Sequence, residues 1–279
     1  MSTSSTSSRC SGPTLSSRDN SAVPRATAPE RQEPEHQKSE KIPIFRLLAL
    51  LLIPPMELLA RYVIIDGDKL PKHGAFVFAP NHYSEIDPVV IGRVMYKLGR
   101  APRYLTKASL FKVPVLGWFL RTSGQIPVER SGVSRGSDPI ASASKLVRDG
   151  LAVVIYPEGS LTRDPDLWPM RGKTGAVRMA LEAGVPLIPV AHWGTQLVMP
   201  RYAKKISVFP RKTITVKIGD PVDLSAFAGR GLDPTTLHEA TAVLMAAITS
   251  LLVDLRGEPA PAEPWDPAKH KQSETGRFE

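Results

Sequence analysis

Short apolar segments of strand length recur along the middle of the chain and alternate with longer amphipathic stretches. The strand-like segments are residues 75–80, 103–106, 124–130, 151–156, 186–191 and 213–219. Apolar positions with helical spacing favour helices over residues 88–98, 139–149 and 173–183. Because strands that alternate with helices are typical of an α/β domain, we expect a mostly parallel central sheet flanked by helices.

A further helix is predicted after the last strand. It begins at Asp233 and Pro234 and ends at Gly257. Its apolar positions form one stripe, made of Leu237, Leu244, Ile248, Leu251, Leu252 and Leu255. We expect this stripe to pack on the core of the domain.

A leucine-rich stretch, residues 41–65, precedes the first of these strands. Ten uncharged residues separate Arg46 from Glu57, whereas a helix needs about 20 apolar residues to cross a bilayer. Pro54 and Pro55 interrupt the run. We therefore expect no spanning helix but an N-terminal amphipathic helical pair that lies in a membrane interface. The alternative is a helical pair packed on the protein's own core.

Both ends of the chain differ in composition from the middle. Residues 1–40 are rich in Ser, Pro and charge, so we expect a disordered tail. They also lack the apolar run of a signal peptide, so we expect no secretory signal there. Residues 257–279 are polar with several prolines, which predicts a second flexible tail and leaves residues 66–256 as the folded domain. The single cysteine, Cys10, allows no intramolecular disulfide and is typical of a reducing compartment.

The charge of the chain narrows the class of partner. Lys and Arg number 36 against 27 Asp and Glu, for a formal net charge of +9, which favours anionic lipids, phosphorylated substrates or nucleic acid. Aromatic residues make up only 6% of the chain and no nucleic-acid recognition motif appears. Nucleic acid is therefore disfavoured as a partner.

The polar segment NHYSEID, residues 81–87, directly follows the predicted strand 75–80. A neutral histidine can take a proton from a hydroxyl if a second group fixes its tautomer, and a turn can bring Asp87 back to His82 for this purpose. Ser84 and Asp87 also have capping-box spacing. The alternative is a capping acid beside an ordinary loop histidine. A metal site is disfavoured because no second histidine or cysteine stands at ligand spacing.

Two further motifs weaken competing chemistries. The segment RGKTG, residues 171–175, lacks the glycine that a P-loop needs five positions earlier, where Leu167 stands, so ATP or GTP binding is disfavoured. Lys173 can still contact a phosphate as an isolated cation near a helix start. Ser160 does not lie in a Gly-x-Ser-x-Gly elbow, which disfavours a serine hydrolase.

Four blocks carry a resemblance to a known family. In order they are NHYSEID, GQIPVER (124–130), YPEGSLTR (156–163) and VPLIPV (185–190). Their order and separation resemble those of the 1-acylglycerol-3-phosphate O-acyltransferase family of glycerolipid acyltransferases. The similarity runs from about residue 41 to 220 and includes the linking stretches 107–124 and 171–184.

The resemblance implies an activity and a location. Residues 66–256 would form an acyltransferase domain that moves a fatty acyl group from acyl-CoA or acyl carrier protein to the hydroxyl of a lysophospholipid, giving phosphatidic acid. The acyl thioester is a co-substrate, and no bound cofactor is expected. A peripheral enzyme on the cytoplasmic face of a membrane is implied, with membrane lipids as partners.

The resemblance also implies residue roles. His82 is expected as the general base and Asp87 as its orienting partner, so that the acceptor hydroxyl itself attacks and no acyl-enzyme forms. Arg130 resembles the family arginine that holds the acceptor phosphate. The other candidate phosphate-binding residues are Glu158, Gly159, Ser160, Arg163 and Lys173. For Glu158 the alternative is a buttress of the loop.

One position departs from the family pattern. The third block often carries an arginine where Leu161 stands, and Arg163 follows two residues later. Either Arg163 supplies the charge, or the site accepts another lysolipid, such as a glycosylated or amino-acid lipid. A non-enzymatic lipid-binding protein is the remaining alternative, although such a protein has no need of His82 beside Asp87.

Overall fold

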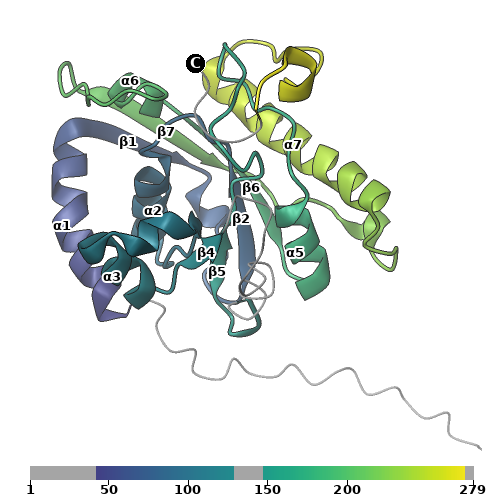
Figure 1. Ribbon diagram of the computed structural model, residues 1–279, viewed down its shortest axis with the longest axis horizontal. Helices are drawn as coiled ribbons and strands as arrows, with labels where there is room; N and C mark the ends of the chain where they lie inside the picture. The colour runs from purple at the N-terminus through teal and green to yellow at the C-terminus, as the bar shows by residue number, and fades with distance from the viewer. Residues whose placement is uncertain (1–41, 129–146, 274–279) are drawn as a thin grey trace, which may run out of the picture. The chain divides into compact units, whose positions relative to one another are not determined.

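The computed structural model of the protein describes residues 42–128 and 147–273 (Figure 1). The predicted disordered tail 1–40, Arg130 and most of the helix expected over 139–149 lie outside the described residues. The described ranges form one mixed α/β domain built on a central sheet.

The central sheet has its strands in the order β1-β7-β6-β2-β5 in the described part of the chain. These strands are β1 (Ala60–Ile65), β2 (Phe76–Pro80), β5 (Ala152–Val154), β6 (Leu187–Trp193) and β7 (Lys212–Ile218). Neighbours run parallel except β6 and β7, which are antiparallel and pair Val190 with Ile218. A separate parallel pair joins β3 (Leu105–Lys107) to β4 (Ile126–Val128). The expected mostly parallel sheet is confirmed.

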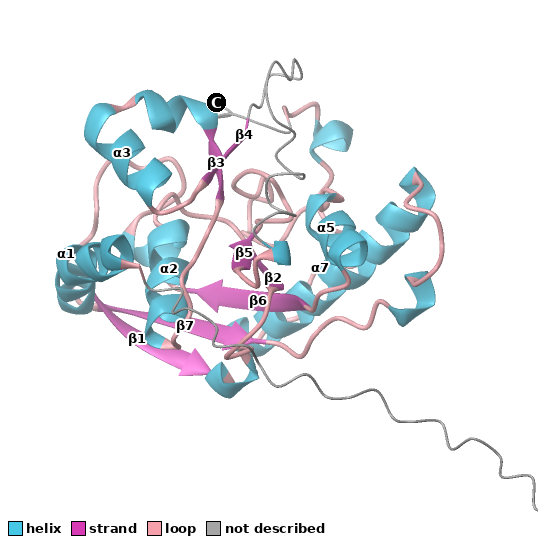
Figure 2. Ribbon diagram, turned by 90° about the horizontal axis from the view of Figure 1, so that it is seen from below, coloured by secondary structure: helices cyan, strands magenta, loops and turns pink. Residues whose placement is uncertain are grey.

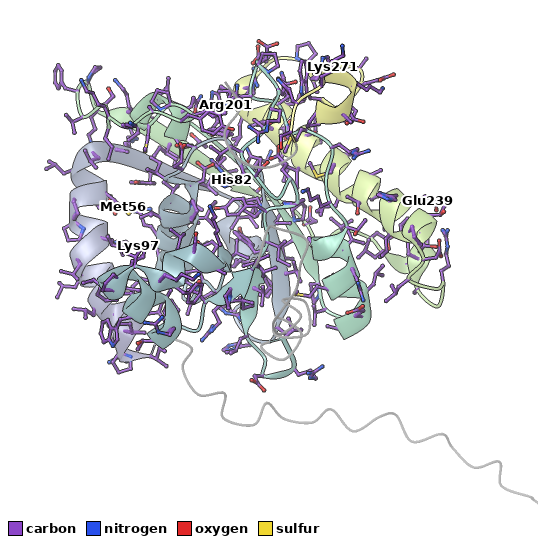
Figure 3. The ribbon with its side chains drawn as sticks, viewed as in Figure 1. Met56, His82, Lys97, Arg201, Glu239 and Lys271 are labelled. Carbon is purple, nitrogen blue, oxygen red and sulfur yellow. The ribbon has the colours of Figure 1, made fainter. Side chains whose placement is uncertain are left out.

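Helices cover both faces of the sheet (Figures 1 and 2). On one face lie α1 (Pro43–Leu59), which carries Met56, and α2 (Asp87–Lys97), which ends at Lys97 (Figure 3). Across the sheet lie α5 (Gly175–Ala183) and α7 (Pro234–Arg256), with Glu239. The remaining described helices and 3-10 turns are α3 (Pro114–Thr122), α6 (Thr195–Val198), η1 (Gly67–Lys69), η2 (Ala108–Lys112), η3 (Ser225–Phe227) and η4 (Pro267–His270).

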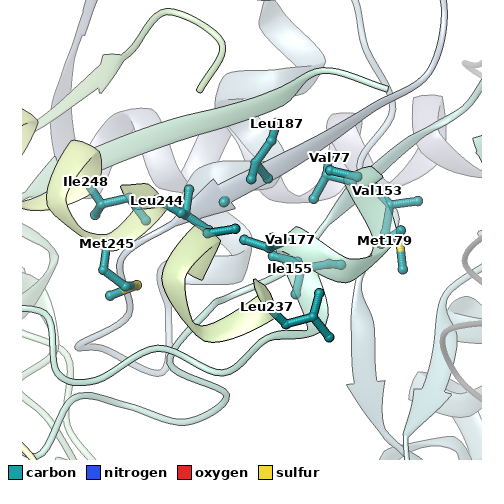
Figure 4. Close-up of a cluster of buried hydrophobic side chains, with 14 of the residues drawn as sticks. Val77, Val153, Ile155, Val177, Met179, Leu187, Leu237, Leu244, Met245 and Ile248 are labelled. Carbon is teal, nitrogen blue, oxygen red and sulfur yellow. The ribbon is translucent and has the colours of Figure 1, made fainter. Parts of the chain in front are cut away.

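The apolar strand β2 is buried on both sides, because successive side chains point to opposite faces of the sheet. Phe76 and Phe78 pack in the cluster that includes α2, whereas Val77 and Ala79 pack in the cluster that includes α5 and α7. In the second cluster Val77 is grouped with Leu187 and Leu244 (Figure 4). Two-sided burial explains why this strand reads as a continuous apolar run.

Helix α7 begins and ends where the sequence predicts. The Asp233 carboxylate accepts the N–H groups of Thr235 and Thr236 at 3.0 and 3.1 Å, and Gly257 closes the helix at φ 69°. By length and apolar composition alone, α7 is long enough to cross a membrane, the one such helix in the described ranges. Its stripe instead packs on β6 and α5, as expected from the pattern.

The predicted break at Pro54 and Pro55 does not occur, and α1 is one continuous helix rather than a pair. A proline leaves without a partner the carbonyl group four residues before it. Those carbonyls belong to Leu50 and Leu51, which are exposed residues. The interruption therefore falls on the outer side of the helix and leaves its packed side intact.

The last six residues of the stretch 41–65 also differ from the expected helices. Residues 60–65 form β1, an edge strand that pairs in parallel with β7 from Ala60↔Lys212 to Ile65↔Lys217. Val63, Ile64 and Ile65 favour a strand because their branched side chains fit a pleated surface. This strand fixes the C-terminal end of α1 to the sheet.

The C-terminal segment to Ser273 is described and packs on the domain, which differs from the flexible tail expected after residue 257. Trp265 forms a parallel bridge with Met170, and the N–H of Arg171 donates to the Trp265 carbonyl at 2.9 Å. The Trp265 ring stacks on His270 with the ring centroids 3.5 Å apart. Composition gave no sign of these contacts, because they depend on one aromatic residue and on backbone hydrogen bonds, which form with any sequence.

Two neighbouring positions on α7 test its packing. Leu244 is 0% exposed and Val243 is 42% exposed. We expect Leu244→Ala to lower the free energy of unfolding by about 2–5 kcal/mol, the usual cost of a core cavity, and Val243→Ala to change it by less than about 0.5 kcal/mol. Urea denaturation followed by circular dichroism measures both. Equal losses would contradict the packing of this stripe on the sheet.

Candidate functional site

The sheet brings two polar segments to one edge. Strands β2 and β5 are parallel neighbours, so the loops that follow them leave from the same edge of the sheet. The loop after β2 holds His82, which lies near the middle of the domain in Figure 3. The loop after β5 holds Glu158 and Gly159. Ligand sites in open α/β sheets form at such edges.

His82 and Asp87 meet as their spacing predicts. The His82 Nδ1 lies 2.9 Å from the Asp87 Oδ2. Since the carboxylate accepts, Nδ1 carries the proton and Nε2 is left as the basic nitrogen. The imidazole is 14% exposed and lines a cavity. This is the geometry that general-base chemistry requires.

The Asp87 carboxylate is fully buried and accepts hydrogen bonds from several groups. The Tyr83 and Ser84 N–H groups donate to Oδ2 at 2.8 Å each, and the Thr195 hydroxyl donates to Oδ1 at 2.6 Å. Burial alone would raise the pKa of Asp87, but His192, His82 and the Thr195 hydroxyl together lower the pKa below its ordinary value. Asp87 therefore stays ionised and keeps its bond to His82.

The expected capping box forms only in part. The Asp87 carboxylate reaches back to the Ser84 N–H, but the Ser84 hydroxyl donates to the Met199 carbonyl at 2.6 Å instead of capping α2. The helix begins at Asp87 with Pro88 in its first turn and has no side-chain cap at Ile86. The carboxylate thus serves both the turn and the histidine.

Glu158 positions the backbone of His82. Its Oε1 accepts the His82 N–H at 2.9 Å, and its Oε2 accepts the Met170 N–H at 3.0 Å. The His82 carbonyl in turn accepts the Thr162 N–H at 2.7 Å. Burial raises the pKa of Glu158 to about 8, against the opposing effect of the two N–H donors. Of the two roles considered for Glu158, this geometry supports the buttress and not a phosphate contact.

Gly159 and Lys173 lie together at the open side of the site. Gly159 has φ +71°, and a β-carbon added there would come within 3.0 Å of the Lys173 Cδ. The Lys173 N–H donates to the Pro157 carbonyl at 2.7 Å, which sets the lysine at the start of α5. Both residues line the same cavity as His82. The missing side chain at Gly159 therefore leaves room for the Lys173 side chain, whose ammonium group can contact a phosphate near the start of α5.

Ser160, Leu161 and Arg163 are buried and do not line that cavity. The Arg163 guanidinium donates to the Tyr202 hydroxyl, and the Ser160 hydroxyl lies 3.4 Å from the Leu161 carbonyl. The structure therefore does not bring Ser160 and Arg163 to the acceptor side of His82. Arg130, the remaining candidate, lies outside the described residues and stays a prediction.

Sequence reasoning missed two side chains of the site. The Tyr156 ring stacks on His82 with centroids 4.1 Å apart and an interplanar angle of 25°. Its position immediately before Pro157 in the third block was the available signal. Thr195 lies 108 residues beyond Asp87 in sequence, and no local pattern points to it.

A cavity of about 930 Å³ opens beside His82. Its walls come mainly from apolar side chains of α1, α2, α3 and β3, with Tyr156 next to the histidine. Lining residues include Leu48, Ala49, Leu52, Met56, Val89, Leu105, Leu116 and Phe119. This volume is at the upper end of the range for small-molecule sites, and its lining suits a long apolar group.

The arrangement of possible metal ligands is visible in the described part of the chain. In residues 42–128 and 147–273 no group of three His, Cys, Asp or Glu side chains is placed to hold a metal ion. The Nε2 of the buried His192 donates to the Asn81 carbonyl at 2.9 Å and is therefore not available as a metal ligand.

Known proteins resemble this chain in sequence. A family model described as "Acyltransferase" matches residues 62–193. The 1-acyl-sn-glycerol-3-phosphate acyltransferase of Bacillus subtilis is 30% identical over 59% of this chain and 75% of its own length. An uncharacterized acyltransferase of Schizosaccharomyces pombe is 30% identical over 68% of this chain, and the match spans 66% of that relative. The chloroplastic 1-acyl-sn-glycerol-3-phosphate acyltransferase of Brassica napus is 32% identical over 44% of this chain, and the match spans only 34% of that relative.

A solved structure supports the fold. The 1-acyl-sn-glycerophosphate acyltransferase of Thermotoga maritima aligns with a TM-score of 0.59 at 22% identity, over 78% of this chain and 81% of that one. The family model and the sequence relatives, together with this fold, show that the chain belongs to the glycerolipid acyltransferase family that contains the 1-acyl-sn-glycerol-3-phosphate acyltransferases.

Proposed function

We propose that this protein transfers a fatty acyl group from an acyl thioester, acyl-CoA or acyl carrier protein, to the free hydroxyl of 1-acylglycerol-3-phosphate. The observation that carries the proposal is the His82–Asp87 pair, 2.9 Å apart, on the wall of an apolar cavity of about 930 Å³. The family relatives that bear this activity in their names support it.

The proposed reaction is a direct transfer. His82 Nε2 removes the proton from the acceptor hydroxyl as its oxygen attacks the thioester carbonyl carbon. Asp87 stabilises the imidazolium that forms, since it is an ionised partner of Nδ1. The carbon–sulfur bond then breaks, and the departing thiolate takes the proton from His82. The products are an ester and a free thiol, so that no protein nucleophile is needed.

The acyl chain is assigned to the apolar cavity and the phosphate to the open side of the site. Ala49, Val89 and Phe119 line the cavity on three different helices. Lys173 offers positive charge where a phosphate would lie beside His82, and Gly159 leaves room for the Lys173 side chain. Arg130 is expected to join them, as the family resemblance implies.

A second acceptor class deserves a test because of Leu161. This residue is buried where the family often has arginine, and Arg163 is engaged with Tyr202. Positions 161 and 163 of the third block thus bring no cation to the cavity, which favours an acceptor with a neutral or zwitterionic headgroup, such as a glycosylated or amino-acid lysolipid. Comparing kcat/KM for these acceptors with that for 1-acylglycerol-3-phosphate distinguishes the two classes.

The location proposed is a membrane surface. Helix α1 is apolar on two sides: Phe45, Leu48 and Met56 line the cavity, while Leu47, Leu50 and Leu58 are exposed. An exposed apolar stripe above a lipid-binding cavity suits a helix that lies in the interface of a bilayer. Attachment to the cytoplasmic face follows the family resemblance and is part of the same proposal.

Removing the base tests the reaction. We expect His82→Ala to lower the rate of acceptor-dependent thiol release from acyl-CoA by roughly 10²-fold or more, the usual contribution of a positioned base. His73→Ala is the matched control, because His73 is an exposed histidine outside the site. The assay follows thiol release with and without 1-acylglycerol-3-phosphate. Near-normal turnover in His82→Ala would refute the assignment; if the wild type is inactive, acyl carrier protein thioesters and other lysolipids replace the substrates.

The raised pKa of Glu158 makes a prediction about pH. With a folded pKa of about 8 and an ordinary value of 4.5, the folded state holds a proton that the unfolded state has lost between about pH 5 and 8. Stability of the wild type should therefore fall as pH rises through this window and level off above it. Glu158→Gln removes this titration, so its unfolding free energy should fall less steeply. Urea denaturation of both proteins at each pH gives the comparison, and parallel curves would mean that the folded pKa is not raised.

Filling the cavity tests the acyl site. Ala49 lines the cavity from α1, whereas its neighbour Leu50 is exposed on the outer side. We expect Ala49→Trp to lower kcat/KM for long-chain relative to short-chain acyl-CoA by roughly tenfold or more, since a pocket rejects what it cannot hold. Leu50→Trp should keep the wild-type ratio. An unchanged ratio in Ala49→Trp would place the acyl chain elsewhere.

A further inference from the structure

An exposed loop of apolar and basic residues joins α6 to β7 at residues 199–211. Phe209 is 87% exposed, and Ile206 and Val208 are exposed beside it. Large apolar side chains gathered in this way are uncommon on a monomeric surface unless something covers them. The segment from Met199 to Lys212 also contains five basic residues and no acidic one. Lys204 and Lys205 are exposed and make no ion pair with the described residues.

The loop is anchored to the site at its first end. The Met199 carbonyl accepts the Ser84 hydroxyl at 2.6 Å, and the Tyr202 N–H donates to the Glu85 carboxylate at 3.0 Å. Arg201 donates to the carbonyls of Thr162 and Asp164. Ser84 and Glu85 belong to the same block as His82. The root of the loop is therefore fixed against the segment that holds the base.

At its second end the loop is anchored to α1. Arg211 donates to the Glu57 and Ala60 carbonyls at the C-terminal end of that helix. Leu58, between these two residues, is 79% exposed. Figure 1 shows the loop beyond the end of α1 from which β1 begins. Arg211 thus holds the second end of the loop beside the C-terminal end of α1, where Leu58 is exposed.

We propose that the 199–211 loop is a second membrane-contact element, which places Phe209 in the interface of a bilayer while Lys204 and Lys205 meet anionic headgroups. Apolar side chains next to lysines are the combination that binds such a surface, because burial and electrostatic attraction act together. The inference goes beyond the proposed acyl transfer and rests on it only for the need of a lipid surface. Because the loop is attached to α1 at one end and to the segment 81–87 at the other, its contact with a bilayer would bring His82 close to the lipid.

A fluorophore on the loop tests insertion directly. Cys10 is the only native cysteine, so Cys10→Ser with Phe209→Cys gives one site for an environment-sensitive dye. We expect a blue shift on vesicles of phosphatidylcholine and phosphatidylglycerol and a smaller one on phosphatidylcholine alone. The matched control is Cys10→Ser with Leu232→Cys, at an exposed leucine two residues before α7. Helix α7 lies across the sheet from α1 (Figure 1). Position 232 should show no shift.

Charge removal tests the role of the lysines. We expect Lys204→Gln/Lys205→Gln to weaken sedimentation with the anionic vesicles roughly tenfold or more, because each lysine near an anionic surface contributes. Lys269→Gln/Lys271→Gln removes the same charge from the C-terminal segment and should leave binding unchanged. Equal binding of both variants and the wild type, or equal spectra at positions 209 and 232, would overturn the proposal.

Two further outcomes are informative. If vesicle binding persists in Lys204→Gln/Lys205→Gln but the KM for an acyl carrier protein thioester rises, the loop docks an acidic protein and the membrane proposal is wrong. Vesicle binding is measured without substrates, so it does not depend on catalysis. If no acyl transfer is detected yet position 209 still shifts on anionic vesicles, the proposed function fails while the loop assignment stands.

Discussion

The buried carboxylate of Asp87 is the constraint on which the site depends. A buried charge is costly unless it is hydrogen-bonded, and here two backbone N–H groups, the Thr195 hydroxyl and the His82 ring satisfy it. Those donors come from the turn after β2 and from the start of α6, so the carboxylate holds together segments more than a hundred residues apart. The same bonds fix the tautomer of His82. One group thereby ties the fold of the loop to the basicity of Nε2.

Around this pair, one cavity combines mostly apolar walls with a few charged groups. Helices α1, α2 and α3 supply much of the apolar lining, and the loop after β5 brings Gly159 and Lys173 to the same cavity. The proposed substrates, which have a long chain and a charged end, suit such a mixed lining. The proposed membrane contact would account for the exposed leucines of α1 and for the exposed apolar residues of the 199–211 loop.

A second buried acid, Glu158, holds the backbone of the same loop at His82. Glu158 joins the His82 backbone to Met170, and Met170 pairs with Trp265 of the C-terminal segment. Backbone contacts therefore connect the end of the described chain to the histidine. Composition concealed this connection, because a polar, proline-containing segment with one tryptophan gives no periodic pattern. The raised pKa of Glu158 arises from the same burial.

The sequence by itself determined the alternation of strands and helices, the ends of α7 and the His82–Asp87 pair. Each depends on local periodicity, on caps or on a short turn, all of which are written in neighbouring residues. The family blocks added the reaction class. Only the tertiary structure decided that α1 continues through Pro54 and Pro55, that residues 60–65 join the sheet, that Arg163 turns to Tyr202, and that Thr195 completes the site. These depend on contacts between residues far apart in the chain, where burial and available hydrogen-bond partners outweigh local preference.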